Sequence, residues 1–259
     1  MLRGGISSVS YRNRKAAEII EAARKTRFSG IEWSSDTHAP PGDLRIAENL
    51  MMATLRAGLT VSAYGSFHRI GGCAEEFAAV LASARSLQAP NVRVWAAPRS
   101  GGLLLASMAE TARALADEAG KFGITLCIEA HERSAVDRYE TLAELVRLVA
   151  HPFFRVSWAP LPGLGKVELL EGAAALAPEL TLIHVRNWNA GYDRRPLADK
   201  EGTWPGIIDA FLAHEMKTDL DHWALIEYLE DESTRTLERE AQALATLVSR
   251  RIQTEAPTV

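Results

Sequence analysis

Cysteine is scarce in this sequence, which has only Cys73 and Cys127 among its 259 residues. Two cysteines cannot build the disulfide framework of a small secreted protein, so we expect a reducing, cytoplasmic environment. No apolar run approaches the roughly 20 residues that a membrane helix needs. Residues 1–10 also lack the apolar stretch of a secretory signal peptide. We therefore expect neither a membrane protein nor a disulfide-stabilised secreted protein.

An excess of positive charge is also missing. The chain has 29 Lys and Arg residues against 33 Asp and Glu residues, which gives a net charge of −4. Proteins that bind the phosphates of nucleic acids are usually basic, so we expect no nucleic-acid partner. The hydrophobic share of 47% and the charged share of 24% are typical of soluble globular domains. A chain of this length can bury its core without a structural metal or a disulfide.

Eight short, apolar, β-rich segments recur along the chain, and segments with helical periodicity separate them. The predicted strands are residues 5–10, 30–33, 61–66, 92–97, 125–131, 155–159, 181–186 and 224–229. Several of them are almost continuously apolar, as parallel strands covered by helices are. Eight such units predict a (β/α)8 barrel, formed as a single domain by residues 1–259, with residues 252–259 as a frayed tail.

A doubly wound open sheet is the competing architecture. It would usually carry a glycine-rich turn after the first strand, but residues 11–15 read YRNRK. We therefore expect the barrel and no nucleotide cofactor.

The longest interval between predicted strands contains the loop 187–203, and long loops in compact domains are often lids or binding loops.

The active site of such a barrel lies at the carboxyl ends of its strands. Glu129 and His131 are two residues apart at one predicted strand end, so they share a face, and so do His184 and Arg186 at another. Glu227 ends the last predicted strand. A carboxylate inside a barrel is costly unless a metal or a cation neutralises it. Glu129, His184 and Glu227 therefore predict a divalent metal site, with ion pairs across the barrel as the alternative.

Further polar and aromatic residues follow the predicted strands, and flat aromatic faces suit polyhydroxylated ligands. The predicted substrate-binding residues are Glu32, Trp33, Asp36, His38, His68, Trp95, His131, Trp158, Arg186 and Asn187. The alternative is structural for several of them. The tryptophans can belong to the core, and Asp36 and His38 can belong to a turn.

A family resemblance rests on four short sequence segments at predicted strands. They are GIEW at 30–33, LCIEAH at 126–131, LIHVRNW at 182–188 and LIE at 225–227. The sequence resembles the xylose-isomerase-like TIM barrels from Ile6 to about Val248. This group includes sugar isomerases and epimerases, inosose dehydratases and the type-2 apurinic endonucleases. The resemblance implies one divalent metal (Mn, Mg, Zn or Co) bound by Glu129, His184 and Glu227.

The sequence departs from the family pattern at two places. Ala159 stands where the resemblance leads us to expect a metal-binding Asp, and Arg186-Asn187 replaces a common Lys-Asp pair. Either Asp36, His38 or His131 completes a rearranged metal site, or the ligand is bound without metal.

The resemblance implies a sugar or sugar-derivative isomerase or epimerase that moves a proton next to a carbonyl. Glu129 and Glu227 would be the acid and the base, and the metal would stabilise the enediolate. Without metal, His131 or Arg186 would have to stabilise the enediolate. The substrate would be a small carbohydrate.

The alternative is a catalytically silent carbohydrate-binding barrel. An apurinic endonuclease is disfavoured by the net charge of −4 and the thinned ligand set. Dimers and tetramers are common among similar proteins, which leaves a homo-oligomer open.

Overall fold

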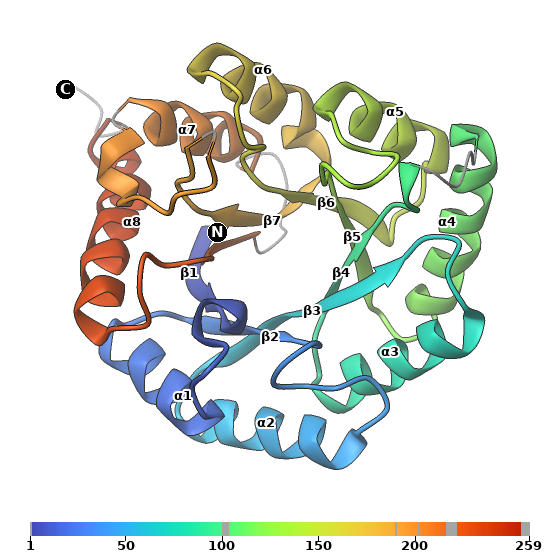
Figure 1. Ribbon diagram of the computed structural model, residues 1–259, viewed down its shortest axis with the longest axis horizontal. Helices are drawn as coiled ribbons and strands as arrows, with labels where there is room; N and C mark the ends of the chain where they lie inside the picture. The colour runs from blue at the N-terminus through green and yellow to red at the C-terminus, as the bar shows by residue number, and fades with distance from the viewer. Residues whose placement is uncertain (1, 100–103, 190, 201, 216–221, 255–259) are drawn as a thin grey trace.

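Eight parallel strands close into a barrel with a ring of helices around it in the computed structural model (Figure 1). Each strand pairs with its neighbour in the sequence. Strand β1 (Leu2–Ser7) closes the barrel on β8 (His222–Ile226), with Gly5 opposite Leu225. The structure describes residues 2–99, 104–189, 191–200, 202–215 and 222–254. The predicted (β/α)8 architecture is confirmed.

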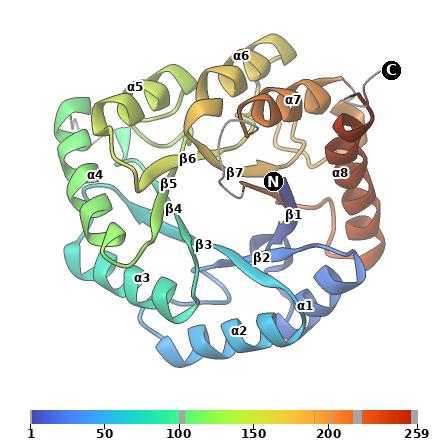
Figure 2. The same cartoon turned by 180° about the vertical axis from the view of Figure 1, so that it is seen from behind.

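The other elements alternate in the expected order, and every predicted strand overlaps an observed one (Figures 1 and 2). The remaining strands are β2 (Gly30–Ser34), β3 (Thr60–Arg69), β4 (Asn91–Trp95), β5 (Thr125–Glu129), β6 (Phe154–Trp158) and β7 (Leu180–Val185). The helices are α1 (Ala16–Lys25), α2 (Leu44–Arg56), α3 (Ala74–Ser86), α4 (Leu105–Gly120), α5 (Tyr139–Val149), α6 (Lys166–Leu176), α7 (Thr203–Glu215) and α8 (Thr234–Thr254). Short 3-10 turns are η1 (Ser8–Tyr11), η3 (Ala177–Glu179) and η4 (Leu197–Lys200).

Two of these elements bear on expectations from the sequence. Helix α8 continues to Thr254, so it includes the first residues of the predicted frayed tail, and residues 255–259 lie outside the described residues. Within the described part of the chain, none of the helices combines the length and apolar character that crossing a bilayer requires.

Strand alternation divides the buried side chains into two groups. Outward residues such as Ile128 and Ile183 belong to the main core between the strands and the helices. A separate small cluster consists of Ala63, Cys127, Leu182, Trp223 and Leu225. Four of these residues lie two or four positions before Glu129, His184 or Glu227 on the same strands, so they face the barrel interior as well. An apolar layer therefore fills the barrel beneath the polar strand ends.

Tyr139 at the start of α5 holds the end of β6. Its hydroxyl donates to the carbonyl of Ala159 at 2.8 Å and accepts from the amide of Leu161 at 3.0 Å. Its ring stacks on Trp158 with 5.7 Å between centroids. The ring also covers Gly172 in α6, where an added Cβ would lie 2.1 Å from Tyr139 Cδ2. Gly172 is thus required by close packing, and this packing fixes the strand end that borders the barrel mouth.

We expect Gly172→Ala to destabilise the fold. Overpacking typically lowers the free energy of unfolding by about 1–3 kcal/mol, which exceeds the gain of roughly 1 kcal/mol from replacing a helical glycine by alanine. Urea unfolding measures the difference. Ala174→Ser, at an exposed position of the same helix, is the control and should change stability by no more than about 0.5 kcal/mol. A Gly172→Ala protein as stable as the parent would contradict this packing.

Candidate functional site

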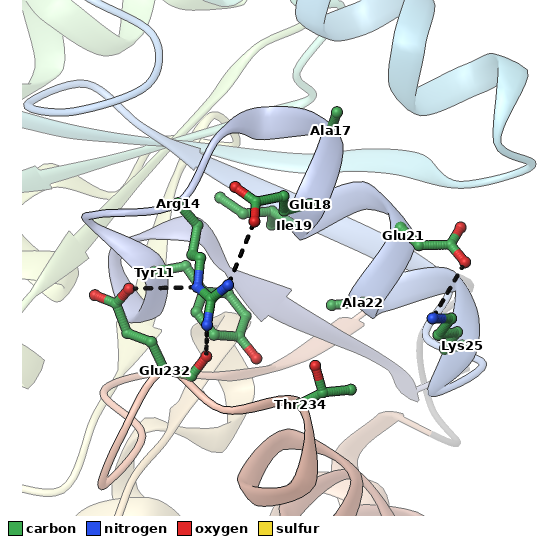
Figure 3. Close-up of a pocket in the computed structure, with 10 residues that line it drawn as sticks. All are labelled: Tyr11, Arg14, Ala17, Glu18, Ile19, Glu21, Ala22, Lys25, Glu232 and Thr234. Atoms are coloured by element: carbon green, nitrogen blue, oxygen red, sulfur yellow. Dashed lines mark hydrogen bonds and ion pairs between the residues drawn. The ribbon is translucent and has the colours of Figure 1, made fainter.

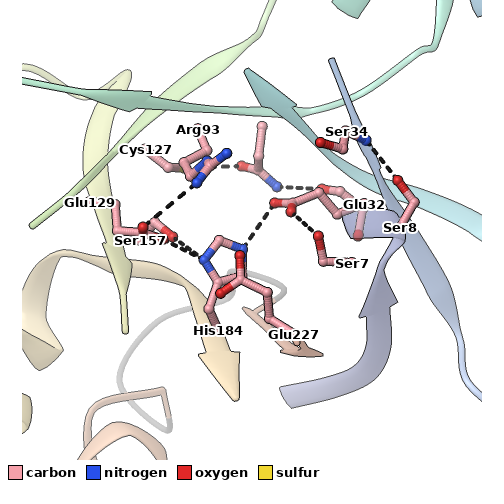
Figure 4. A network of polar contacts seen from close by, with 12 residues as sticks. Ser7, Ser8, Glu32, Ser34, Arg93, Cys127, Glu129, Ser157, His184 and Glu227 are labelled. Carbon is pink, nitrogen blue, oxygen red and sulfur yellow. Dashed lines mark hydrogen bonds and ion pairs between the residues drawn. The ribbon is translucent and has the colours of Figure 1, made fainter. Parts of the chain in front are cut away.

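A layer of charged side chains closes the barrel at the carboxyl ends of the strands (Figure 4). Each of them exposes less than a tenth of its surface. The members are Glu32 (1% exposed), Arg93 (4%), Glu129 (1%), His184 (0%), Arg186 (8%) and Glu227 (2%). They come from β2, β4, β5, β7 and the residues directly after β7 and β8, so the barrel itself converges them on one region.

His184 joins two glutamates across the barrel. Its Nδ1 lies 2.5 Å from Oε2 of Glu129, and its Nε2 lies 3.1 Å from Oε2 of Glu32. The other oxygen of Glu32 accepts a hydrogen bond of 2.6 Å from Ser7 Oγ. Ser157 Oγ lies 3.4 Å from His184 Nδ1. Strands β2, β5 and β7 are thereby linked through one imidazole ring.

Arg93 supplies a second cation to the same glutamate. Its Nη1 lies 3.6 Å from Oε1 of Glu129, and the indole nitrogen of Trp95 donates to the same oxygen at 3.3 Å. The guanidinium carbon lies 5.0 Å from the ring centroid of Phe67 and 4.7 Å from that of Trp95. Aromatic faces attract a cation, so the two rings hold Arg93 against the carboxylate.

Arg186 is the third cation of the layer and pairs with Glu227, through Nη1 and Oε2. The guanidinium lies 4.6 Å from the ring centroid of Trp188 and 5.9 Å from that of Tyr228. Tyr228 follows Glu227 in the left-handed region, at φ 55°, and its amide donates to Ser10 Oγ at 2.9 Å. Non-glycine residues adopt this conformation only where the surroundings enforce it. The chain therefore turns sharply directly after Glu227.

The ion pairs set the protonation states of this layer. Burial opposes the charge on His184, but the carboxylates of Glu32, Glu227 and Glu129 outweigh it and raise the pKa of His184 well above its usual value. Burial likewise opposes ionisation of Glu32 and Glu129, yet the charge and hydrogen bonds of His184 lower the pKa of both. With the two guanidinium groups, three cations therefore face three carboxylates.

The predicted metal ligands meet in this layer, but their contacts do not fit a divalent ion. A metal binds the lone pair of a histidine nitrogen, whereas both ring nitrogens of His184 face carboxylates. Glu227 is engaged by Arg186. Among the residues that the structure describes, no group of three His, Cys, Asp or Glu side chains is arranged to hold a metal ion. The predicted set of Glu129, His184 and Glu227 is an ion-pair network in this structure.

Two of the three residues proposed to complete a rearranged metal site, Asp36 and His38, do not join the charged layer. Asp36 pairs with Arg12 at a partly exposed position. His38 lies with its Nε2 3.0 Å from the carbonyl of Arg14 and its Nδ1 3.2 Å from Ser8 Oγ. These contacts tie the loop after β2 to the segment before α1, so both residues have structural contacts where substrate contacts were predicted.

Trp95 and His131, two of the predicted substrate-binding residues, lie beside the charged layer. Their rings are 4.4 Å apart between centroids, and Trp95 contacts Glu129 directly. Both are partly exposed. Together they form an aromatic wall on the side of β4 and β5, which is a suitable surface for an apolar sugar face.

Trp33 and Trp158 correct the sequence prediction. Both are fully buried in the main core between strands and helices. Trp33 donates its indole N–H to Thr54 Oγ1 of α2 at 3.1 Å, and Trp158 packs against Trp204 with 6.0 Å between centroids. Each follows an inward residue, so alternation turns it away from the barrel interior. Neither is placed to contact a ligand in the barrel mouth.

His68 and Asn187 are also engaged within the protein. His68 is 1% exposed, and its ring lies 5.1 Å from that of Phe77 in α3. Asn187 donates from its side chain to the carbonyl of Pro196 at 2.7 Å and shapes the loop after β7. Tyr192, later in the same loop, donates from its hydroxyl to the carboxylate of Glu132 after β5.

Three residues of the network were not predicted: Arg93, Ser7 and Ser157. The signal for Arg93 was present, since Asn91, Arg93 and Trp95 alternate with valines and so share the inward face. The two serines carry no comparable signal, because short polar residues are common at strand ends.

A groove beside the barrel, between α1 and the segment before α8, offers no comparable chemistry (Figure 3). Its most prominent charge, Arg14, is held by Glu18 at 3.3 Å and by the backbone carbonyl of Glu232 at 3.0 Å. The charged layer inside the barrel is therefore the candidate site.

No family model matches the chain, and no curated protein matches it either. Solved structures do. The probable 3-DHS dehydratase AsbF from Bacillus anthracis superposes with a TM-score of 0.74 at 15% identity, covering 95% of this chain and 99% of that one. An L-ribulose 3-epimerase gives 0.74 at 13% identity, covering 100% and 99%.

The IolI protein with a bound zinc atom superposes with a TM-score of 0.70 at 13% identity, covering 96% of this chain and 98% of that one. At these identities the likeness establishes the TIM-barrel fold alone, and the solved structures that share it include xylose isomerase domain proteins. The resemblance stated from the sequence is confirmed at that level.

The raised pKa of His184 predicts a pH-dependent stability. A cation with a raised folded-state pKa stabilises the fold fully below its unfolded pKa of about 6.5, and this contribution is lost as the pH rises through the folded pKa. The difference in unfolding free energy between parent and His184→Gln should therefore shrink above about pH 6.5, by up to roughly 1.4 kcal/mol per pH unit. Urea unfolding from pH 6 to 9 measures it.

Ala174→Ser, at an exposed position of α6, is the control, because it adds and removes no titratable group. Its stability should run parallel to that of the parent over this range. A His184→Gln curve that also runs parallel would show that His184 carries no additional proton in the folded protein.

Proposed function

We propose that this protein is an isomerase or epimerase of a sugar or sugar derivative, and that it moves a proton next to a carbonyl group. The observation that carries the proposal is the placement of Glu129 and Glu227. They lie at the ends of β5 and β8, both are buried, and each is bound by a cation. Solved structures with this fold include an L-ribulose 3-epimerase and a 3-keto-D-glucoside 4-epimerase.

In this reaction one carboxylate takes a proton from the carbon beside the carbonyl, and the other carboxylate returns a proton. The charge that develops on the carbonyl oxygen needs donors nearby. The layer holds such donors in His184 and in the two guanidinium groups. The partly exposed rings of Trp95 and His131 offer a face on which a sugar ring can pack.

A catalytically silent carbohydrate-binding barrel is the second candidate. Two observations favour it. Every carboxylate of the layer already has a cation partner, and neither the end of β6 at Ser157 and Trp158 nor the following Ala159 supplies a carboxylate. Sugar binding detected by calorimetry, without turnover on a panel of keto-sugars, would favour this candidate over the enzyme.

Replacing either glutamate by glutamine should remove turnover, because the amide neither accepts nor returns a proton. Losses for a general acid or base are roughly 10²- to 10⁴-fold. The measurement is the rate of epimerisation or isomerisation of the keto-sugar on which the parent is active, for Glu129→Gln and Glu227→Gln. Glu132→Gln, at an exposed position of the same rim, is the matched control and should retain activity. Retained activity in both site variants would refute the assignment.

A further inference from the structure

We infer that the protein supplies the positive charge of this site itself: the guanidinium groups of Arg93 and Arg186 occupy the role of a divalent metal and bind the substrate's oxygens directly. The inference rests on the reaction proposed above, and it assigns two residues to that reaction. It makes turnover independent of added metal.

The first support is that the donor atoms are engaged. Glu129 faces His184, Arg93 and Trp95 at 2.5, 3.6 and 3.3 Å. Glu227 faces Arg186. Both ring nitrogens of His184 contact carboxylates. An entering metal ion would have to break several of these contacts at once, inside a layer that exposes almost no surface.

The second support is the charge balance. The carboxylates of Glu32, Glu129 and Glu227 are matched by His184 and two guanidinium groups. An arginine keeps its charge at every accessible pH, so it cannot make room for a metal by losing a proton. A divalent ion would add an unbalanced double charge to a buried region, which is strongly unfavourable.

The third support is that both arginines keep a free donor. Among the described residues, the Nε of Arg93 and the Nε of Arg186 are buried without a hydrogen-bond partner, and so is the indole nitrogen of Trp188 beside Arg186. Buried donors are rarely left unpaired in folded proteins. A ligand rich in hydroxyl and carbonyl oxygens would satisfy them, and an enediolate oxygen would satisfy them best.

The strand ends agree with this assignment. On β6, Ser157 Oγ lies 3.4 Å from His184 Nδ1, and Ala159, 2% exposed, follows two residues later. Neither side chain can coordinate as a carboxylate does. The side of the barrel that could have added a negative charge for a metal adds none, while β4 and the end of β7 each add a guanidinium.

Metal binding by the parent protein is the first test. The full chain is purified without chelator, its metal content is measured by elemental mass spectrometry, and its melting temperature is recorded with MgCl2, MnCl2, ZnCl2 or EDTA. We expect far less than one equivalent of metal and the same melting temperature in all four solutions. One equivalent of metal, with a rise in melting temperature that Glu129→Gln abolishes, would overturn the inference.

The second test substitutes the arginines. Arg186→Met and Arg93→Met should each lower kcat by roughly 10²- to 10³-fold, as the loss of one oxyanion donor does, and Arg186→Lys should recover part of the loss because it keeps the charge. Arg194→Met is the control, since Arg194 lies over Tyr228 at 5.2 Å and binds the carbonyl of Leu229. It should keep kcat unchanged.

A purely structural role for the arginines predicts a different pattern. Melting temperature would then fall in the methionine variants while kcat of the folded fraction stayed at the parent value, and this result would overturn the inference. If a methionine variant does not fold, the metal measurements on the parent still decide. If the protein binds no metal and turns over no substrate, the proposed function is refuted, but the inference that the site works without metal is not. If turnover requires added metal, this inference is refuted and the proposed function stands.

Discussion

The neutralisation of three buried carboxylates is the constraint on which the rest of this barrel depends. Moving an isolated carboxylate out of water is so unfavourable that it must be paired or protonated. Here the pairing runs through His184, which contacts Glu32 and Glu129 from opposite sides. Removing one partner would leave a buried charge without compensation, which typically destabilises by about 3–5 kcal/mol. The serine contacts and the aromatic faces on Arg93 and Arg186 follow from the same requirement.

Much of the fold could be predicted, because the repeated strand-helix units of a barrel require a repeated pattern of apolar residues in the sequence. Eight apolar segments separated by helical ones left few architectures open. The ends of strands were less predictable. The first strand stops at Ser7, where the turn η1 begins, and β3 continues to Arg69. Such ends depend on contacts with neighbouring strands, and local residue preferences do not encode those contacts.

The site was predictable in its parts but not in its pairing. Alternation placed Glu129 and His184 inside the barrel, and it would have placed Arg93 inside and Trp33 outside had it been applied to every strand. The partners themselves could not be derived. Glu32 and His184 are 152 residues apart in the sequence, and only the closed barrel brings them together. The metal expectation came from the residue types at the strand ends and from the resemblance, whereas the pairing of each carboxylate with a cation is visible only in the folded barrel.

The same pairing restricts what the layer can accept. A ligand that reaches Glu227 must replace contacts that Arg186 now makes, because both side chains are almost fully buried. An apolar ligand would leave these charges unpaired, and that would weaken binding strongly. A polyol both donates and accepts hydrogen bonds, so its hydroxyl groups can stand between a carboxylate and a guanidinium without leaving either unsatisfied. The sharp turn at Tyr228 fixes the backbone directly after Glu227, and this helps to hold the Glu227 carboxylate against Arg186. The charge balance that stabilises the barrel is therefore also the reason why the proposed function names a polyhydroxylated ligand.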